Sequence, residues 1–426
     1  METAVLFGIF IFLFCLNVPI AVALATAAIV VLASTTDFSL YMIAQRMFAA
    51  LLSPPLLAIP SFVFAGVVMS HGGISKYLIA ALRTWVGHLP GGLAVVTIAA
   101  CAIFAAISGS SPATAAAIGA IMLPAMIENG YSKRYAMGLV AASGTLGILI
   151  PPSVTMVIFG IVAEYSIGEL FAAGMIPGIL LAGILVVSAV IYAQRQKMTK
   201  TAKATWPERW KATFKAIPGM FLPFFILGSI YSGIVTPTEA AVLSVFYTLV
   251  VSAFIYRELR WTGIRPILRE AINISSMIYL IIAAAMVFSL FLTAKQIPQQ
   301  VLMAITAAKV SKWMFFLVTQ IMFFVMGTFL EAVSITLITL PILLPVIRAL
   351  DIPIVQFCVV MTVNMELAMI TPPVGLNLFV VSAMAKEKLE EVVKGVWPFL
   401  MIMVGALILF VVWPDLSTFL PARMRM

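Results

Sequence analysis

The sequence predicts an all-α polytopic membrane protein, built as an inverted structural repeat with two re-entrant helical hairpins and two broken helices. Three observations lead to this fold class. Of the 426 residues, 63% are hydrophobic and 10% are charged, whereas about a quarter of the residues of soluble domains are charged. Two long apolar runs are each interrupted by a Pro-Pro pair, and a shift of 221 residues superimposes the two pairs.

The first interruption lies between Gly144 and Ser153, inside an apolar run over residues 135–163. Pro151 and Pro152 donate no backbone hydrogen bond and push the preceding residue out of helical geometry, so the helix must break at membrane depth. Unpaired backbone groups are costly in hydrocarbon, and such a break persists only inside protein or beside a polar cavity. Paired broken helices indicate the substrate and ion site of membrane carriers.

The second interruption, Thr371-Pro-Pro-Val-Gly375, lies in the apolar run 354–384. The shift of 221 residues also pairs further prolines and one glutamate. We interpret these matches as an internal duplication, the alternative being coincidence in a proline-rich membrane protein. The matched pairs are Pro124 with Pro345, Pro152 with Pro373, Pro177 with Pro398, and Glu169 with Glu390.

The first half begins with two short apolar spans joined at Asn17-Val-Pro19, for which one long tilted helix is the alternative. A mixed segment over 37–53 is typical of an interfacial amphipathic helix. The small hydroxyl residues over 108–114, between short apolar arms, favour a re-entrant hairpin with its tip at mid-depth, with two ordinary spans as the alternative. In order, the elements are spans 5–16, 20–33 and 55–70, an arm 71–90, the hairpin 93–127, the broken helix 135–163 and a span 170–192.

A basic linker separates this half from a second half with the same plan. The second half is predicted to contain spans 218–234 and 239–256, an interfacial segment 257–270, a span 272–292, an arm 294–312, a hairpin 313–347, the broken helix 354–384 and a span 396–412. The predicted division is a first repeat 1–193 (scaffold 1–90, hairpin and broken helix 91–193), a cytoplasmic linker 194–216, and a second repeat 217–426 (scaffold 217–312, hairpin and broken helix 313–426).

Five net crossings in each half give the halves opposite orientations, as in an inverted repeat. Lysine and arginine are more frequent in the loops on the side of the linker, so that side is predicted to be cytoplasmic and both termini periplasmic. The hairpin tips and helix breaks then meet near the midplane. There, free carbonyls and Ser, Thr and Asn oxygens suit Na⁺, and helix N-termini suit anions.

Two acids, Glu331 and Glu366, lie nearest these features. An acid at membrane depth is a functional hypothesis by default, although Glu331 as a cap and Glu366 as an acceptor for freed backbone groups remain alternatives. No lysine or arginine lies in the core segments, so a carboxylate substrate would depend on hydroxyls, helix N-termini and a bound cation. The sequence contains no phosphate-binding loop for ATP, no basic module for nucleic acid, no metal-ligand spacing, and no nucleophile with a base. An enzyme is therefore not expected.

The chain resembles the large membrane subunit of tripartite ATP-independent periplasmic (TRAP) transporters over essentially its whole length. By general likeness it is most similar to the sialic-acid type. The motifs that carry the resemblance are Ser-Gly-Ser-Ser-Pro-Ala-Thr-Ala from Ser108, Gly-Ile-Leu-Ile-Pro-Pro-Ser ending at Ser153, Gly174 to Gly178, Gly233 to Ala240, and Thr371 to Asn377.

The resemblance implies a Na⁺-coupled elevator in the bacterial inner membrane, in which a transport domain of hairpins and broken helices moves against a scaffold domain. It also implies an organic-acid substrate such as sialic acid, a separate small four-helix membrane subunit, a periplasmic substrate-binding protein, two or more Na⁺ ions and no use of ATP. Another carboxylate, such as a C4-dicarboxylate, is the alternative substrate. A channel and a non-transporting assembly subunit are the alternatives of another class.

In the family, Na⁺ sites lie at the hairpin tips and helix breaks, and the resemblance supports carrying this role to Ser108 to Ser111 and Gly327 to Thr328. The residues expected to bind Na⁺ are Ser108, Gly109, Ser110, Ser111, Gly144, Pro151, Gly327, Thr328, Glu331, Thr371 and Gly375. The residues expected to bind substrate are Thr114, Thr145, Ser153, Ser334, Asn364 and Asn377.

Overall fold

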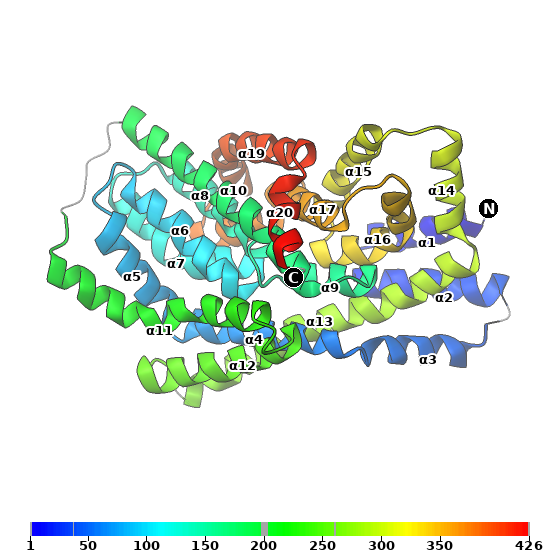
Figure 1. The fold of residues 1–426 in the computed structure, drawn as a ribbon, viewed down its shortest axis with the longest axis horizontal. Helices are drawn as coiled ribbons and strands as arrows, with labels where there is room; N and C mark the ends of the chain where they lie inside the picture. The colour runs from blue at the N-terminus through cyan, green and yellow to red at the C-terminus, as the bar shows by residue number, and fades with distance from the viewer. Residues whose placement is uncertain (1, 37, 197–202, 260, 425–426) are drawn as a thin grey trace.

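The computed structural model describes residues 2–36, 38–196, 203–259 and 261–424, and every regular element in these ranges is a helix (Figure 1). The helices of the first half are α1 Glu2–Cys15, α2 Ile20–Thr35, α3 Leu40–Leu51, the 3₁₀ turn η1 Pro54–Leu57, α4 Ala58–His71, α5 Ile74–Val86, α6 Gly92–Ser108, α7 Ser111–Glu128, α8 Lys133–Thr145, the 3₁₀ turn η2 Leu146–Ile148, α9 Val154–Ala163 and α10 Ile167–Arg195.

The second half repeats this order. Its helices are α11 Trp206–Tyr231, α12 Pro237–Val250, the π-helical turn η3 Val251–Ile255, α13 Trp261–Ala294, α14 Ile297–Ala307, α15 Lys312–Gly327, α16 Ala332–Ala349, α17 Ile354–Met369, α18 Leu376–Ala385, α19 Leu389–Val412 and α20 Asp415–Met424. Adding 221 to the bounds of α7 gives 332 and 349, which are the bounds of α16. The duplicated sequence therefore folds into duplicated helices.

Local sequence explains where several of these helices begin. Ser132 accepts a hydrogen bond from the Tyr135 amide at the start of α8, and Ser153 does the same for Met156 at the start of α9. Thr236 and Glu239 form a reciprocal capping box before α12, with the Glu239 carboxylate 2.7 Å from the Thr236 amide nitrogen. Such side chains satisfy amide groups that have no partner inside the helix.

The helices form two packed groups. One group contains α2, α3, α4, α12 and α13, with α5 against α11. The other contains both hairpins (α6–α7 and α15–α16), both broken helices (α8–α9 and α17–α18), α10 and α19. The two arm helices, α5 and α14, lie at opposite ends of the molecule (Figure 1). These arms contact the second group, α5 through α6 and α14 through α16.

Ion pairs join parts of the chain that are distant in sequence. The side chains of Lys133 and Glu387 are 2.7 Å apart, and Arg134 pairs with Glu391. The loop before α8 therefore lies against the turn between α18 and α19, as expected for two loops on the same side of the membrane. Lys76 and Glu258 pair at 3.0 Å, and this hydrogen bond raises the pKa of Lys76.

One predicted boundary was wrong. The interfacial segment 257–270 and the span 272–292 are not separate, because α13 runs without interruption from Trp261 to Ala294. Pro266 is the sixth residue of α13, so its missing N–H costs one intrahelical hydrogen bond near the start of the helix, and α13 continues through it. Within the predicted linker 194–216, α10 continues to Arg195 and α11 begins at Trp206. Residues 197–202 of the linker, like Asp37 of the predicted interfacial segment, lie outside the described residues.

Eight of the described helical segments are long and apolar enough to cross a membrane. α6 and α15, the first arms of the two hairpins, have 17 and 16 residues and are shorter than a typical span of about 20 residues. The two short hairpins and two interrupted helices confirm the predicted fold class. The predicted pair of short spans at the N-terminus is also present, as α1 and α2.

Candidate functional site

The two helix breaks have similar geometry but different surroundings. The first separates η2 from α9 and contains a cis peptide bond between Pro151 and Pro152. The second separates α17 from α18, contains a cis bond between Pro372 and Pro373, and ends at Gly375, whose φ is 54°. All residues of the first break are buried, whereas both prolines of the second are exposed.

Each hairpin tip lies against the break of its own half. A Cβ atom added to Gly109, which has a φ of 59°, would lie 3.0 Å from the carbonyl oxygen of Pro152. In the second half, the amide of Val374 donates a 3.1 Å hydrogen bond to the carbonyl oxygen of Thr328. A Cβ atom added to Gly327 would lie 2.4 Å from that of Ala368. Glycine thus permits the close backbone approach at both tips.

A hydrogen-bond pair then joins the two halves. The side-chain amide of Asn377, in the first turn of α18, donates to Ser111 Oγ at 2.7 Å and to the carbonyl oxygen of Ala141 at 3.1 Å. Ser111 is the first residue of α7. α18 packs on α7, and the equivalent helices α9 and α16 pack on each other. The second break and the first hairpin therefore form one continuous polar region.

A cavity of about 330 Å³ lies where these parts meet the scaffold group. Tip residues of both hairpins, residues beside both breaks, and residues of α4 and α13 line it. The lining residues are Val63, Gly109, Ser110, Ser111, Pro112, Ala113, Ala116, Ile148, Val154, Thr155, Glu270, Ile274, Met277, Ile278, Glu331, Ala332, Val333 and Met369.

Helix ends dominate the part of the cavity wall that the hairpins and breaks contribute. The first turns of α7, α9 and α16 supply Ser111, Val154 and Ala332, respectively. Helix N-termini carry partial positive charge and favour anions. Ile148 and Met369 are the last residues of η2 and α17, whose free carbonyl groups favour cations. One cavity is thus bordered by groups suited to an anion and by groups suited to a cation.

Charged side chains at the cavity are all acidic within the described chain. Glu270 and Glu331 line the cavity, and the lining includes no lysine or arginine. Glu270 Oε2 lies 3.1 Å from His71 Nε2. Glu331 Oε1 is buried without a hydrogen-bond partner among the described residues. An anion cannot enter this cavity favourably unless cations or helix dipoles offset the two carboxylates.

Buried side-chain oxygens without a hydrogen-bond partner are frequent around the second hairpin and second break. Buried polar atoms in native proteins nearly always have a partner, so such atoms indicate a bound ion or water. Among the described residues of these segments, they are Oε1 of Glu331, Oγ of Ser334, Oδ1 of Asn364, both carboxylate oxygens of Glu366, and Oδ1 of Asn377.

At the first hairpin tip and the end of α8, by contrast, the serine and threonine hydroxyls named here are satisfied within the protein. Ser108 Oγ and Thr114 Oγ1 are 2.7 Å apart. Ser143 and Thr145 donate to carbonyl oxygens of their own helix, those of Leu139 and Ala142. A ligand at the first tip would therefore contact backbone carbonyls and hydroxyl lone pairs, since the hydroxyl protons are already engaged.

The structure brings only some of the predicted site residues to the cavity. Of those expected to bind Na⁺, the cavity is lined by Gly109, Ser110, Ser111 and Glu331, while Ser108, Gly144, Pro151, Gly327, Thr328, Thr371 and Gly375 lie at the tips and breaks behind it. None of the six residues expected to bind substrate lines it: Thr114, Thr145, Ser153, Ser334, Asn364 and Asn377. These assignments remain predictions.

Sequence reasoning missed the scaffold wall of the cavity. Glu270, Ile274 and Met277 lie on one face of α13, at positions that helical periodicity places together. The charged residues over 257–270 predict a separate interfacial segment that ends at Glu270, and this prediction does not join Glu270 to Ile274 and Met277 on one helical face. The available signal was an acid followed by apolar residues at i+4 and i+7.

A membrane-embedded inverted repeat, with paired hairpins and broken helices around a central cavity, defines a secondary transporter. The profile of the family described as "Tripartite ATP-independent periplasmic transporter, DctM component" matches residues 7–416. The chain belongs to this family, as a large permease component. It is therefore a membrane transporter permease and not an enzyme.

The relatives support the same family. Over 440 residues the chain is 38% identical to the C4-dicarboxylate TRAP transporter large permease of Rhodobacter capsulatus, covering 100% of both chains. It is 43% identical over 366 residues to the protein of that description in Pseudomonas aeruginosa, covering 86% of each. It is 37% identical to the isethionate TRAP transporter permease of Oleidesulfovibrio alaskensis, covering 97% of this chain and 66% of the relative.

Among solved structures, the fold is similar to that of the YdaH transporter of Alcanivorax borkumensis, whose title notes an unusual topology. The TM-score is 0.63, and the match covers 88% of this chain and 87% of the other. Sequence identity is 12%, so the likeness concerns the fold alone.

Proposed function

We propose that the chain imports an organic-acid anion together with Na⁺, as the translocation subunit of its transporter. The observation that carries this proposal is the cavity between the two hairpin tips, the breaks and α13. It is bordered by the first turns of three helices and by two acids, with no basic residue in its described lining. A companion cation would offset the acids and favour an anion in this cavity, which supports coupling of the two.

Na⁺ is proposed to bind at the tips and breaks. Sodium prefers oxygen ligands in carriers of this kind, including the carbonyls of unwound helices. At the first site, the region around Ser108 to Ser111 supplies hydroxyl and carbonyl oxygens next to the break. At the second, Glu331 and Asn377 bring buried oxygens that have no partner among the described residues. The two tip-and-break units, which Asn377 and Ser111 join, are proposed to hold two or more ions.

The substrate is proposed to be a small carboxylate or related organic anion. The relatives carry C4-dicarboxylate and isethionate names, and these favour the alternative carboxylate substrate over sialic acid. Neither compound shares the long polyhydroxylated tail of a sialic acid. A cavity of about 330 Å³ is at the lower end of the range for small-molecule sites, about 300–1,000 Å³.

The proposed mechanism is an elevator movement. The hairpins, broken helices, α10 and α19 would move together against the scaffold group, carrying the cavity across the membrane. A separate small four-helix subunit would support the scaffold, and a periplasmic binding protein would deliver substrate to a permease in the bacterial inner membrane with both termini periplasmic. Neither ATP nor nucleic acid has a role in this proposal.

Counterflow in proteoliposomes tests the proposal. Vesicles containing the chain and its small subunit, preloaded with unlabelled succinate, should accumulate labelled succinate only when Na⁺ and the binding protein are present outside. Isethionate and sialic acid, each with its matched binding protein, serve as comparison substrates. Uptake that is independent of Na⁺ and of every other cation gradient would reject the coupling. Non-saturable flux would indicate a channel, and no flux with a correctly assembled complex would indicate an assembly subunit.

A further inference from the structure

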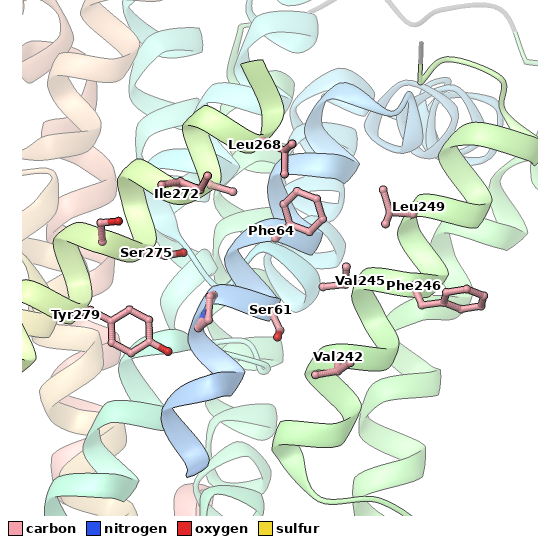
Figure 2. Close-up of a pocket in the computed structure, with 13 residues that line it drawn as sticks. Ser61, Phe64, Val242, Val245, Phe246, Leu249, Leu268, Ile272, Ser275 and Tyr279 are labelled. Atoms are coloured by element: carbon pink, nitrogen blue, oxygen red, sulfur yellow. The ribbon is translucent and has the colours of Figure 1, made fainter. Parts of the chain in front are cut away.

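α13 has two opposite faces with different roles. Glu270, Ile274 and Met277 face the central cavity. On the other face, Leu268, Ile272 and neighbouring residues line an outer groove between α4, α12 and α13, with a volume of about 610 Å³ (Figure 2). At about 100° per residue, these two sets of positions lie on opposite sides of the helix. The groove is therefore separate from the proposed transport site.

The walls of the groove are apolar and uncovered within the described chain. Figure 2 shows Phe64 of α4 and Val245 of α12 directed into the space next to Leu268 of α13. Phe246 is 69% exposed and Ile272 is 59% exposed. Ser275 and Tyr279 continue the lining along α13.

A basic cluster lies at one end of the groove. A second hollow on the same face shares Leu268 and Ile272 with the groove and adds Arg265, Arg269 and Asn273. The i, i+4 spacing places the two arginines next to each other. Both arginines are exposed, and neither makes an ion pair with a described residue.

The nearby acids are already engaged elsewhere. Glu258 pairs with Lys76 at 3.0 Å, and Glu270 contacts His71 at 3.1 Å. The two arginines are thus a concentrated positive charge at the mouth of an apolar groove, a combination that suits a molecule with an anionic head and a hydrocarbon tail.

We propose that this groove binds an anionic phospholipid, with its phosphate between Arg265 and Arg269 and one acyl chain lying along α13 toward Tyr279. Ten residues separate Arg269 from Tyr279, which corresponds to about 15 Å along a helix. This is half of the roughly 30 Å hydrocarbon core of a bilayer, the depth that one acyl chain occupies in its leaflet. Basic pockets between membrane helices recognise such headgroups. A protein helix seated here would need acidic side chains of its own to pair with both arginines, and it is the competing outcome of the test.

Native mass spectrometry of the chain with its small membrane subunit tests this site. The complex is titrated with phosphatidylglycerol and, separately, with phosphatidylethanolamine. Arg265→Gln/Arg269→Gln removes the head contacts, and Ser276→Trp fills the groove while leaving both arginines. Arg83→Gln/Arg195→Gln is the matched control, because it also removes two exposed positive charges, at the ends of α5 and α10. Size-exclusion profiles and melting temperatures confirm that each variant folds.

Each basic residue near an anionic headgroup contributes about fivefold in binding, so the double arginine variant should bind phosphatidylglycerol about 30-fold more weakly. Ser276→Trp should also lose binding, and the control should match wild type. Equal binding by all variants, or equal affinity for the two lipids, overturns the proposal. Loss in the arginine variant alone overturns the placement of the acyl chain, and a photo-crosslink from position 276 to the small subunit instead of to lipid shows that protein fills the groove.

Discussion

The side-chain amide of Asn377 lies 2.7 Å from Ser111 Oγ, so that the break of the second repeat contacts the hairpin of the first. The two residues are 266 positions apart in the chain. Asn377 also holds the carbonyl oxygen of Ala141 in α8, while its own Oδ1 has no partner among the described residues. This contact makes the two repeats share one polar site, and it supports a dependence of each proposed ion site on the other.

Asn377→Ala should therefore weaken Na⁺-dependent uptake and destabilise the protein. Loss of a buried donor costs about 1–3 kcal/mol when its acceptors are left unpaired. Ser111→Ala should destabilise the Asn377→Ala variant by less than it destabilises the wild-type protein. The double-mutant cycle should give a coupling energy of about 1 kcal/mol. The measurements are the half-saturating Na⁺ concentration for counterflow and the melting temperature. Asn129→Ala, which loses only an exposed bond to Ala125, is the control, and full additivity would contradict the coupling.

Gly109→Ala should abolish transport, because the first hairpin tip would no longer fit against the first break. Gly109 has a φ of 59°, and an added Cβ atom would lie 3.0 Å from the Pro152 carbonyl oxygen. Gly130 is an internal control, because it has a φ of 84° and nothing lies within 4 Å of its added Cβ atom. Both alanine variants bear the left-handed backbone penalty of about 1–2 kcal/mol, but only Gly109→Ala should separate the tip from the break. Equal counterflow rates for the two variants would show that the close contact is dispensable.

Sequence periodicity and proline placement could predict the hairpins, the breaks and their repetition, because these depend on local backbone chemistry. Pro151 and Pro372 each begin an adjacent Pro-Pro pair that interrupts its apolar run, whereas a single proline such as Pro124 stays inside a helix. The same reasoning failed at α13, where Pro266 falls in the first turns and is tolerated. The charged residues around it suggested a separate interfacial segment, although the helix continues through them.

Contacts between distant segments could not be predicted, because they depend on how the two repeats pack. No pattern in the chain pairs Asn377 with Ser111, and their equivalents under the shift of 221 residues are not a matching pair. The place of Glu270 in the cavity wall could not be predicted either, since only tertiary packing brings it to the cavity that Glu331 also lines. The predicted ion residues at the tips reached the cavity more often than the predicted substrate residues, because the tips were located from local sequence alone.

Glu331→Gln should reduce the apparent affinity for Na⁺ by on the order of tenfold or more. A carboxylate about 4 Å from a cation contributes several kcal/mol at an effective dielectric constant near 20, and tenfold corresponds to about 1.4 kcal/mol. The amide keeps the shape of the side chain, removes the charge and replaces one of the two carboxylate oxygens by an NH₂ donor. Glu239→Gln is the control, since Glu239 caps α12 at an exposed position away from the cavity. The half-saturating Na⁺ concentration checks this, and an unchanged value for Glu331→Gln would exclude Glu331 as a ligand.

Crosslinks can distinguish an elevator from a local gate. Lys133 and Glu387 both lie in the proposed moving group, with their side-chain ends 2.7 Å apart. A bifunctional thiol reagent that joins cysteines at these positions, in a cysteine-free background, should therefore leave counterflow within about twofold of the uncrosslinked protein. Val63 of α4 and Val333 of α16 line the same cavity from opposite groups, and a bifunctional thiol reagent joining them should stop transport reversibly. In an elevator the second pair must separate in every cycle, whereas a gate at the second break would leave Val63 and Val333 on the walls of the same cavity throughout. Continued transport with Val63 and Val333 fully crosslinked would therefore reject the elevator and favour movement of α18 alone.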